Sequence, residues 1–245
     1  MNGLLRSLCC ASALLMACVN SSAQILDAPA AVQSVVKNLM PEMTASWLKP
    51  APMAGMWEVA FGPHVFYISE DGQHLLRGDI VKVDGFINLT RPARNRARLD
   101  VIKGLGVSNL IVFKPETSGH MVTIFTDVDC GYCAKLHSEM QSYLDAGIQI
   151  RYAAFPRAGI GSESYRKMVS VWCADDQRMA MTLSKAGQKV ADKTCTNPVA
   201  EQYEVGQLLG VRGTPTMVLE TGDLVPGYLP AGRLLQAIEE AKQRS

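Results

Sequence analysis

Two cysteines, Cys130 and Cys133, enclose Gly131 and Tyr132 and are the residues of this chain best suited to chemistry. They follow the apolar run 121–126 and precede a stretch whose leucines and methionine recur at helical spacing, so the pair should lie where a strand passes into a helix. Unpaired amide groups and the positive end of the helix dipole lower the pKa of a cysteine in such a first turn. We therefore expect Cys130 to be an accessible thiolate that attacks disulfides. Cys133, one turn further in, should be the more buried thiol that resolves the mixed disulfide.

Other uses of a C-x-x-C motif fit this sequence less well. Ala134, and not a histidine, follows Cys133, which excludes covalent attachment of a c-type haem. No second C-x-x-C completes a four-cysteine zinc site, although His137 could join the two cysteines on one helical face, so zinc stays an open alternative. A purely structural disulfide across so short a loop would stabilise the fold little. We therefore expect thiol chemistry that needs no cofactor and no metal.

A proline before a second apolar strand could complete the site. Thr214 and Pro215 come directly before the run 216–220. An X-Pro bond at this position is a candidate for a cis peptide, which would place the Thr214 backbone beside the cysteine pair. An ordinary turn proline explains the same residues, and the local sequence does not choose between the two.

The first residues indicate export. Arg6 is followed by the short apolar run 8–19, and small residues close the segment. This order is typical of a secretory signal peptide, and we expect cleavage after Ala23. A lipoprotein signal that acylates Cys18 is the alternative, although Met16 fits that motif poorly. Export would leave four cysteines in the mature chain, an even number that suggests two disulfides.

Composition and charge exclude several classes of protein. The 245 residues are 48% hydrophobic and carry 24 basic against 23 acidic side chains, which is typical of a globular protein and not of a disordered one. No apolar run approaches the roughly 20 residues that span a bilayer. The near-zero net charge gives no general attraction to nucleic acid. We therefore expect the arginines of residues 91–109 on a solvated connecting helix with one apolar stripe, and not in a nucleic-acid site.

The remaining pattern divides the chain into a small first unit and a larger α/β unit. In the first unit, the run 30–40 has helical spacing, and Asp71 with Gly72 predicts a hairpin turn between strands at 64–69 and 74–83. A unit this small buries little of its surface, so association with a second copy would stabilise it. The second unit should be a central sheet with helices on both faces. Its expected elements are strands at 121–126 and 148–155, a helix from the cysteine pair to Gly147, helical sequence from 162 to 209, a hairpin at 216–225 and a helix at 233–242.

Several motifs together resemble the bacterial periplasmic disulfide isomerases, the DsbC/DsbG family of the thioredoxin superfamily. They are FTDVDCGYCAKLH, RYAAFPR, VWCADD, GVRGTPTMVL and LVPGYLP, with PAPMAGMWEV and YISEDGQHLLRGDI in the first unit. The C-G-Y-C motif is more typical of the DsbC members than of DsbG. The resemblance implies an α+β first unit followed by an α/β unit. Its parts would be a signal peptide at 1–23, a small cystatin-like N-terminal dimerisation domain at 24–90, a linker helix at 91–109, and a thioredoxin-fold catalytic domain at 110–245 with a helical insertion.

The resemblance also implies roles for individual residues. These are Cys130 as the nucleophile, Cys133 as the resolving thiol, Gly131 and Tyr132 as the middle of the redox motif, and Pro215 as a cis-proline after Thr214. It further implies a second disulfide, Cys173–Cys195. We expect this bridge to be buried and inert, and its loop of about 23 residues to contribute roughly 3 kcal/mol to stability.

For the whole protein, the resemblance implies a periplasmic homodimer that rearranges wrong disulfides in misfolded exported proteins. A DsbD-like membrane reductase would keep it reduced. A thiol oxidase and a redox-linked holdase chaperone of the DsbG type are the alternatives. We expect no nucleic-acid partner.

Overall fold

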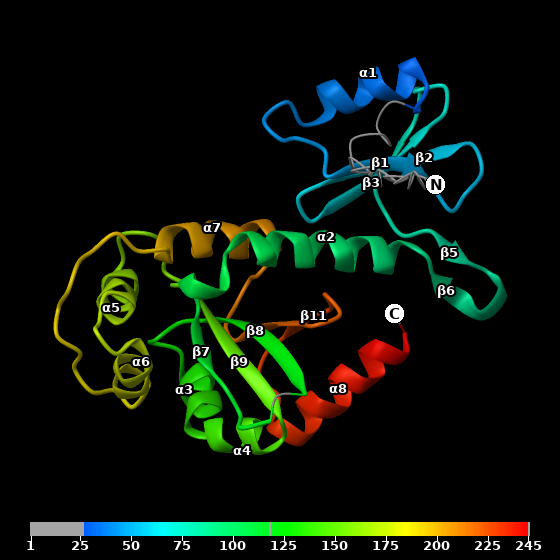
Figure 1. The fold of residues 1–245 in the computed structure, drawn as a ribbon. Coiled ribbons are helices and arrows are strands. Elements are labelled where there is room, and N and C mark those ends of the chain that lie inside the picture. The colour runs from blue at the N-terminus through cyan, green and yellow to red at the C-terminus, as the bar shows by residue number, and fades with distance from the viewer. Residues whose placement is uncertain (1–26, 118, 245) are drawn as a thin grey trace, which may run out of the picture.

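The computed structural model describes residues 27–117 and 119–244, so the expected signal peptide at 1–23 and the alternative lipid site at Cys18 lie outside the described residues. The first unit consists of one helix and an antiparallel sheet with the strand order β1-β2-β3-β4 (Figure 1). Its elements are α1 (Ala30–Leu39), β1 (Trp47–Pro50), β2 (Met56–Phe61), β3 (His64–Ser69) and β4 (Leu75–Leu76). The helix ends just before Pro41, as the sequence predicts.

Helices cover both faces of this first sheet. Because side chains alternate along a strand, Val59 and Phe61 of β2 pack with α1, while Ala60 packs on the opposite face against α2 (Thr90–Gly104). Ala93 and Ala97 of α2 are only 9% and 1% exposed there. The connecting helix that the sequence predicts is therefore present, but it is less solvated than expected, because these small side chains let α2 lie close against the sheet.

Two arginines of α2 hold the helix to the first unit. Arg94 donates a hydrogen bond to the Asp79 carboxylate. The Arg96 guanidinium lies over the ring of Trp47, 5.2 Å from its centroid. These side chains bind within the molecule, which gives a structural reason for part of the basic sequence.

The other two arginines hold α2 to the second unit. Arg91 donates to the backbone carbonyl of Arg244, at the end of the last helix. Arg98 donates to the carbonyl of Gly222 at 3.4 Å, in the turn of the last hairpin. The basic linker sequence thus fastens one helix to both neighbours, which does not require a nucleic-acid partner.

The second strand of the predicted hairpin is interrupted. After pairing with β3 at Leu75 and Leu76, the chain leaves the sheet. It then forms a small separate hairpin of β5 (Val81–Lys82) and β6 (Ile87–Asn88) around the turn η2 (Asp84–Phe86). Asp79 directs this departure, because its carboxylate accepts from Asn88 at 2.8 Å and from Arg94, which draws the chain toward the start of α2.

The second unit contains a five-stranded sheet in the order β11-β10-β8-β9-β7. β8 and β9 run parallel, and the other pairs run antiparallel. The strands are β7 (Ile111–Phe113), β8 (His120–Thr126), β9 (Ile148–Ala154), β10 (Thr216–Leu219) and β11 (Leu224–Pro226). The helices are α3 (Gly131–Ser138), α4 (Met140–Asp145), α5 (Glu163–Trp172), α6 (Gln177–Lys185), α7 (Val199–Leu208) and α8 (Ala231–Gln243), with a short η3 turn at Val107–Asn109.

Two predicted helices are divided in the structure. The helix after the cysteine pair breaks at Glu139, whose amide bonds to the carbonyl of Leu136 at 3.2 Å, a tighter spacing than that of an α-helix. The helical sequence from 162 to 209 forms α5, α6 and α7, and an irregular segment at 186–198 separates the last two.

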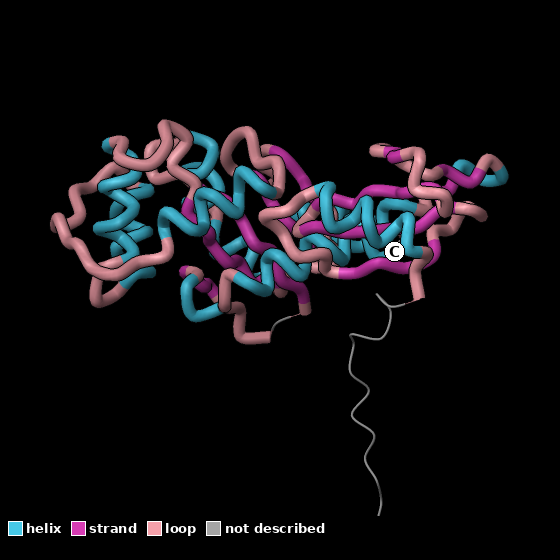
Figure 2. Tube along the Cα trace, turned by 90° about the horizontal axis from the view of Figure 1, so that it is seen from above, coloured by secondary structure: helices cyan, strands magenta, loops and turns pink. Residues whose placement is uncertain are grey.

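Helices pack on both faces of the second sheet, as predicted (Figure 1). On one face, Ile124 and Ile150 contribute to a core with Leu136 of α3 and residues of α4 and α8. On the other face, Phe125 and Phe155 pack with residues of α7 and the end of α2. Seen from above, the molecule is elongated, with α5 and α6 at one end and the β5–β6 hairpin at the other (Figure 2).

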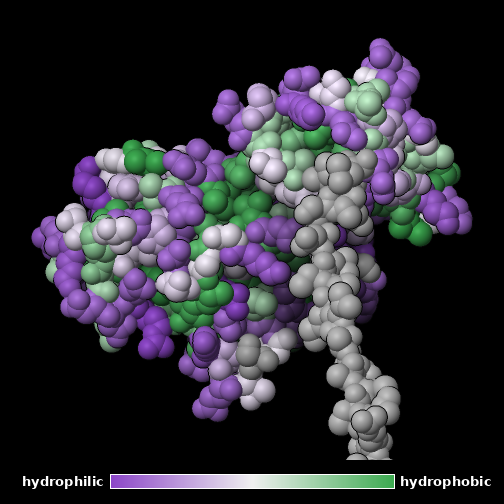
Figure 3. Space-filling model, turned by 45° about the horizontal axis from the view of Figure 1, so that its top comes forward, coloured by the Kyte–Doolittle hydropathy of each residue, from purple (hydrophilic) through white to green (hydrophobic). Residues whose placement is uncertain are grey.

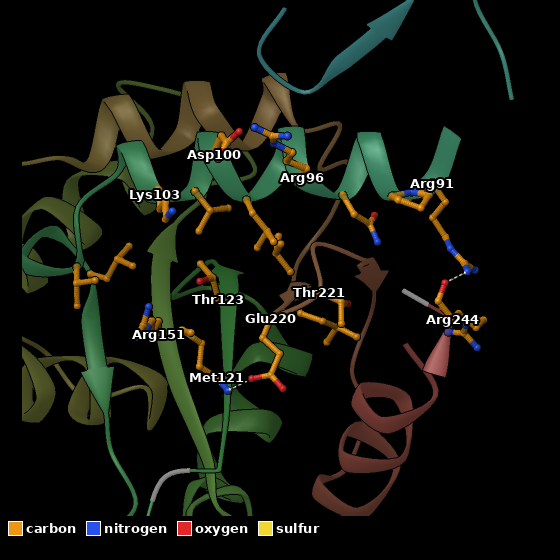
Figure 4. Close-up of a pocket in the computed structure, with 18 residues that line it drawn as sticks. Arg91, Arg96, Asp100, Lys103, Met121, Thr123, Arg151, Glu220, Thr221 and Arg244 are labelled. Carbon is orange, nitrogen blue, oxygen red and sulfur yellow. Dashed lines mark hydrogen bonds between the residues drawn. The ribbon is translucent and has the colours of Figure 1, made fainter. Parts of the chain in front are cut away.

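A cavity of about 700 Å³ separates α2 from the second sheet (Figure 4). Leu99 and Ile102 of α2 line it from one side, and Val218 of β10 lines it from the other. Lys103 and Arg151 also line this space. The helix is therefore fastened to the second unit at separate contacts and not by continuous packing. Among the described helices, none is long and apolar enough to span a membrane.

Candidate redox-active site

Cys130 and Cys133 lie at the junction that the sequence predicts. Cys130 is the N-cap residue of α3, with the extended backbone angles φ −98° and ψ 119°, and its carbonyl accepts from the Ala134 amide at 2.9 Å. The preceding strand β8 ends at Thr126, and a short turn leads to the cysteine. Both cysteines are free thiols in the structure. Cys133 lies one turn into the helix and is 1% exposed.

The surroundings of Cys130 favour its thiolate. A hydrogen bond from the Cys133 thiol is the largest cause that lowers the pKa of Cys130, which reaches about 5. Burial opposes this shift, while a hydrogen bond from the Cys133 amide adds to it. The positive charge of Arg157 acts in the same direction. At neutral pH, Cys130 is therefore ionised.

Cys133 has the opposite character. Its hydrogen bond to Cys130 and its burial both raise its pKa well above the ordinary thiol value. Once one sulfur of so close a pair is ionised, the second keeps its proton. The two cysteines are thus divided into a thiolate and a neutral thiol.

The carboxylates next to the motif are paired. Burial of Asp127 would raise its pKa, but hydrogen bonds from Ser164 and Arg157 outweigh burial and lower it. The Arg157 Nε lies 3.0 Å from this carboxylate. Asp129 contacts the Lys167 Nζ at 3.1 Å. These partners balance the negative charge that would otherwise oppose ionisation of Cys130.

The Thr214–Pro215 peptide bond is cis, which resolves the choice left open by the sequence. Its loop lies directly beside the motif, and the Cys130 thiol contacts the Thr214 carbonyl at 3.2 Å. On the other side of the loop, the Pro215 carbonyl accepts from the Gly227 amide at 2.8 Å, which ties the proline to the last hairpin.

Cys130 is less accessible than expected. The residue is 4% exposed, because the Thr214–Pro215 loop lies over the sulfur. Its neighbours Gly131 and Tyr132 are exposed, Tyr132 at 65%. The sulfur therefore sits just beneath the surface, between the motif and the proline loop, and the expectation of an openly accessible thiolate was wrong in this respect.

An aromatic surface that the sequence analysis missed lies next to the motif. The rings of Tyr132 and Tyr228 stack with their centroids 6.4 Å apart, and the Lys135 ammonium lies 4.7 Å from the Tyr228 centroid. Tyr228 is distant in sequence, and the only signal for it was its place in the LVPGYLP motif. Aromatic rings in this position offer an apolar contact for an incoming chain.

His137, the residue that kept the zinc alternative open, has both of its ring nitrogens within hydrogen-bond distance of hydroxyl groups. Its Nδ1 lies 3.2 Å from the Tyr152 hydroxyl and its Nε2 lies 3.0 Å from the Thr182 hydroxyl. Burial and the nearby Lys185 charge lower the pKa of His137 to about 4, so the ring is neutral. Over the described part of the chain, no group of three or more histidine, cysteine or acidic side chains is placed to hold a metal ion.

Cys173 and Cys195 form a disulfide with Cα atoms 5.7 Å apart. The bridge joins the end of α5 to the irregular segment before α7. Cys173 is half-buried and Cys195 is exposed, so the expectation of a buried bridge was wrong. The segment 186–198 is largely exposed, and for this reason the Cys195 end of the bridge lies at the surface.

Comparison with known proteins extends over both units. The chain is 38% identical to the thiol:disulfide interchange protein DsbC of Escherichia coli K12 over 92% of this chain and 93% of that protein. It is 39% identical to DsbC of Dickeya dadantii over 80% of this chain and 81% of that protein. The chain belongs to the DsbC family.

Family models divide this DsbC family member into two parts. Residues 23–91 match the disulfide bond isomerase protein N-terminal domain, and residues 108–242 match a thioredoxin-like domain. A crystal structure of a disulfide interchange protein from Neisseria gonorrhoeae aligns with 56% of this chain and 98% of that chain, at 27% identity and a TM-score of 0.50. The fold class expected from the sequence is therefore confirmed, with a DsbC-type N-terminal domain before a thioredoxin-like domain.

Proposed function

We propose that this protein is a periplasmic disulfide isomerase that acts through Cys130 and Cys133. The observation that carries the proposal is the low pKa of Cys130, at the start of α3 and beside the Thr214–Pro215 loop. A thiolate is the form of cysteine that attacks a disulfide. The interchange proteins among its relatives support the same chemistry.

The reaction begins when the Cys130 thiolate attacks one sulfur of a wrong disulfide. A bond forms between Cys130 and that sulfur, and the other substrate sulfur leaves as a thiolate. This thiolate can attack a different sulfur of its own chain until Cys130 is released as a thiolate. The number of disulfides is then unchanged, and the enzyme needs no reductant.

A second outcome uses Cys133. Its sulfur attacks Cys130 in the mixed disulfide, the substrate leaves with two thiols, and the enzyme keeps a Cys130–Cys133 disulfide. Two electrons have then passed to the substrate and must be replaced. We assign this role to a DsbD-like membrane reductase, in the periplasm that the expected signal peptide implies.

Substrates should enter beside the proline loop. An extended segment lying along residues 213–215 would bring its sulfur to Cys130, which is 4% exposed. The exposed ring of Tyr132, stacked with Tyr228, would contact apolar side chains of an unfolded substrate. Misfolded exported proteins present both features.

We further propose a homodimer that forms through the N-terminal domain, at residues 24–90. β4 is an edge strand of the first sheet, and its Leu75 and Leu76 are 48% and 39% exposed. Val83 and Phe86, just beyond, are 80% and 84% exposed, and Figure 3 shows apolar side chains at this outer end of the molecule. An open strand edge with apolar neighbours is a surface that a second copy can cover.

Refolding of ribonuclease with scrambled disulfides tests the isomerase proposal. We expect the reduced wild-type protein to restore ribonuclease activity and Cys130→Ala to restore none, because no thiolate remains to attack. Met53→Ala, in an exposed loop of the first unit, is the control and should match the wild type. Full activity of Cys130→Ala would contradict the proposal.

Alkylation of thiols in intact cells tests the redox state. An isomerase must hold Cys130 and Cys133 mostly reduced, so both should be alkylated at once. A pair found mostly oxidised would instead favour a thiol oxidase.

A further inference from the structure

A buried lysine lies beneath the redox motif. Lys185 is the last residue of α6 and is 7% exposed. Its Nζ donates to the Thr126 hydroxyl at 2.8 Å and to the Asp127 carbonyl at 2.6 Å. Both acceptors belong to the end of β8 that leads into the motif.

A buried lysine ammonium lowers the stability of the fold, so its presence here calls for a functional reason. Within the described chain, no carboxylate lies within ion-pair distance of the Lys185 Nζ. The nearest acidic residue, Asp127, has its carboxylate engaged with Ser164 and Arg157. A buried ammonium without an anionic partner destabilises a protein by far more than a neutral side chain in its place.

The hydrogen bond from Lys185 determines whether the Thr126 hydroxyl acts as donor or acceptor toward its other neighbours. A threonine hydroxyl has one hydrogen, and here its oxygen accepts from Lys185. The hydroxyl hydrogen is therefore left for another acceptor, and the Thr126 hydroxyl and the Lys185 charge are both among the causes that lower the pKa of Cys133. Thr126 thus links the Lys185 ammonium, which it contacts directly, to the Cys133 thiol.

Among the groups around Lys185, Asp127 and Arg157 pair with each other, His137 is neutral, and the Cys130 thiolate interacts with the Lys185 charge. His137 of α3 is held neutral by burial, and Tyr152 of β9 has its pKa raised by burial. The groups that interact with the Lys185 charge are Cys130 at the start of α3, Cys133 and His137 within it, Asp127 after β8 and Arg157 after β9. Burial lowers the pKa of Lys185, and the charge of Lys185 in turn lowers that of Cys133.

We propose that Lys185, acting through the Thr126 hydroxyl, is a positioning residue that prepares Cys133 to attack the mixed disulfide. This inference rests on the proposed function, because it concerns the second outcome of that reaction. Cys133 must lose its proton before it attacks, and a fixed positive charge with an oriented hydroxyl stabilises the thiolate that forms.

The step is balanced without any further reactant. The Cys133 sulfur bonds to the Cys130 sulfur, the bond from Cys130 to the substrate breaks, and the substrate sulfur takes up the proton that Cys133 releases. Lys185 and Thr126 keep their own hydrogens throughout. Because direct rearrangement of the substrate needs only Cys130, Lys185 would set how often the enzyme leaves oxidised.

Titration of Cys133 in a Cys130→Ser background measures this effect directly. The ultraviolet absorbance of the thiolate reports its pKa and requires no access for a reagent. We expect Lys185→Met, which keeps an unbranched side chain but removes the charge, to move the titration upward by about one unit. Thr126→Val, which removes the hydroxyl at nearly constant shape, should move it in the same direction. Lys189→Met, an exposed lysine just beyond α6, is the matched control and should cause no shift.

A kinetic experiment separates the two chemical steps. Release of a glutathione adduct from Cys130 by Cys133 should be about tenfold slower in Lys185→Met, because one unit of pKa is a factor of ten in thiolate population. Attack of Cys130 on a disulfide should be nearly unchanged. Equal slowing of both steps would overturn the proposal.

An unchanged Cys133 titration in both Lys185→Met and Thr126→Val would also overturn it. If only Lys185→Met fails to fold, the Thr126→Val titration decides the outcome. The titration needs no isomerase activity. A shifted titration in a protein that cannot refold scrambled ribonuclease would therefore count against the proposed function and not against the role of Lys185.

Discussion

The two cysteines of the motif have the same chemistry in isolation and differ here because of what surrounds each sulfur. Cys130 starts a helix and accepts hydrogen bonds from the thiol and the amide of Cys133, so its pKa falls to about 5. Cys133, three residues later, is buried and donates to the ionised partner, so its pKa rises. A separation of one helical turn is enough to place one sulfur at the helix end and the other inside the fold.

The shifted pKa of Cys130 makes the stability of the reduced protein depend on pH. Between about pH 5 and about pH 8, the folded protein holds Cys130 as a thiolate, while the unfolded chain keeps this thiol protonated near its ordinary pKa of 9.0. The unfolded state then binds more protons, so the free energy of unfolding rises with pH by up to about 1.4 kcal/mol per unit. This stabilisation is lost as the pH falls through about 5.

Urea unfolding of the reduced protein across this range measures the effect. The Cys130→Ser variant should lack the rise, and so should the oxidised protein, in which Cys130 has no proton to lose. A rise of equal size in Cys130→Ser would assign the pH dependence to other groups.

At the scale of secondary structure, α2 and the last hairpin are in close backbone contact, which a prediction of helices and strands alone does not show. Gly222, in the turn between β10 and β11, has a φ of +88° and faces the backbone of α2. A Cβ atom added there would lie 2.3 Å from the carbonyl oxygen of Asn95. The backbone carbonyl of Gly222 also accepts a hydrogen bond from Arg98. Glycine is thus required both for the turn and for the contact with the helix.

Gly222→Ala should therefore destabilise the protein by about 2 to 4 kcal/mol, since it adds a steric clash to an unfavourable left-handed backbone conformation. Gly227→Ala is a matched control, because Gly227 has a φ of +87° but open space at its Cβ position. Thermal unfolding should show a clearly smaller loss for Gly227→Ala. Equal losses would mean that the backbone conformation alone matters and that α2 can move aside.

For the whole molecule, the arrangement of α2 explains how two units that fold around separate cores are connected. Its alanines pack on the first sheet, and Leu105, the residue directly after the helix, is buried in the second unit. Arginines along its length bind both neighbours. The helix therefore sets the orientation of the N-terminal unit relative to the catalytic unit. A dimer formed at β4 would then hold the two C-x-x-C motifs in a fixed arrangement.

The proposed dimer gives a test at this scale. Leu76→Glu should yield a monomer in sedimentation velocity experiments, because a carboxylate placed on the open edge of β4 would be buried without a partner. Met53→Glu, a similarly exposed apolar residue in a loop, should leave the assembly unchanged. If Leu76→Glu sediments like the wild type, the contact between copies lies elsewhere.

The sequence by itself determined the features that depend on neighbours along the chain. The strand before Cys130 and the helix after it follow from periodicity, and the chemistry of a helix end predicts the direction in which the pKa of that cysteine shifts. The tertiary structure decided what depends on residues that are distant in sequence. Lys185 reaches Thr126 across 59 positions, the Thr214 loop covers Cys130 across 84, and Arg91 meets Arg244 across 153. Local patterns show which face of an element is apolar, but they do not show which distant side chain will pack there.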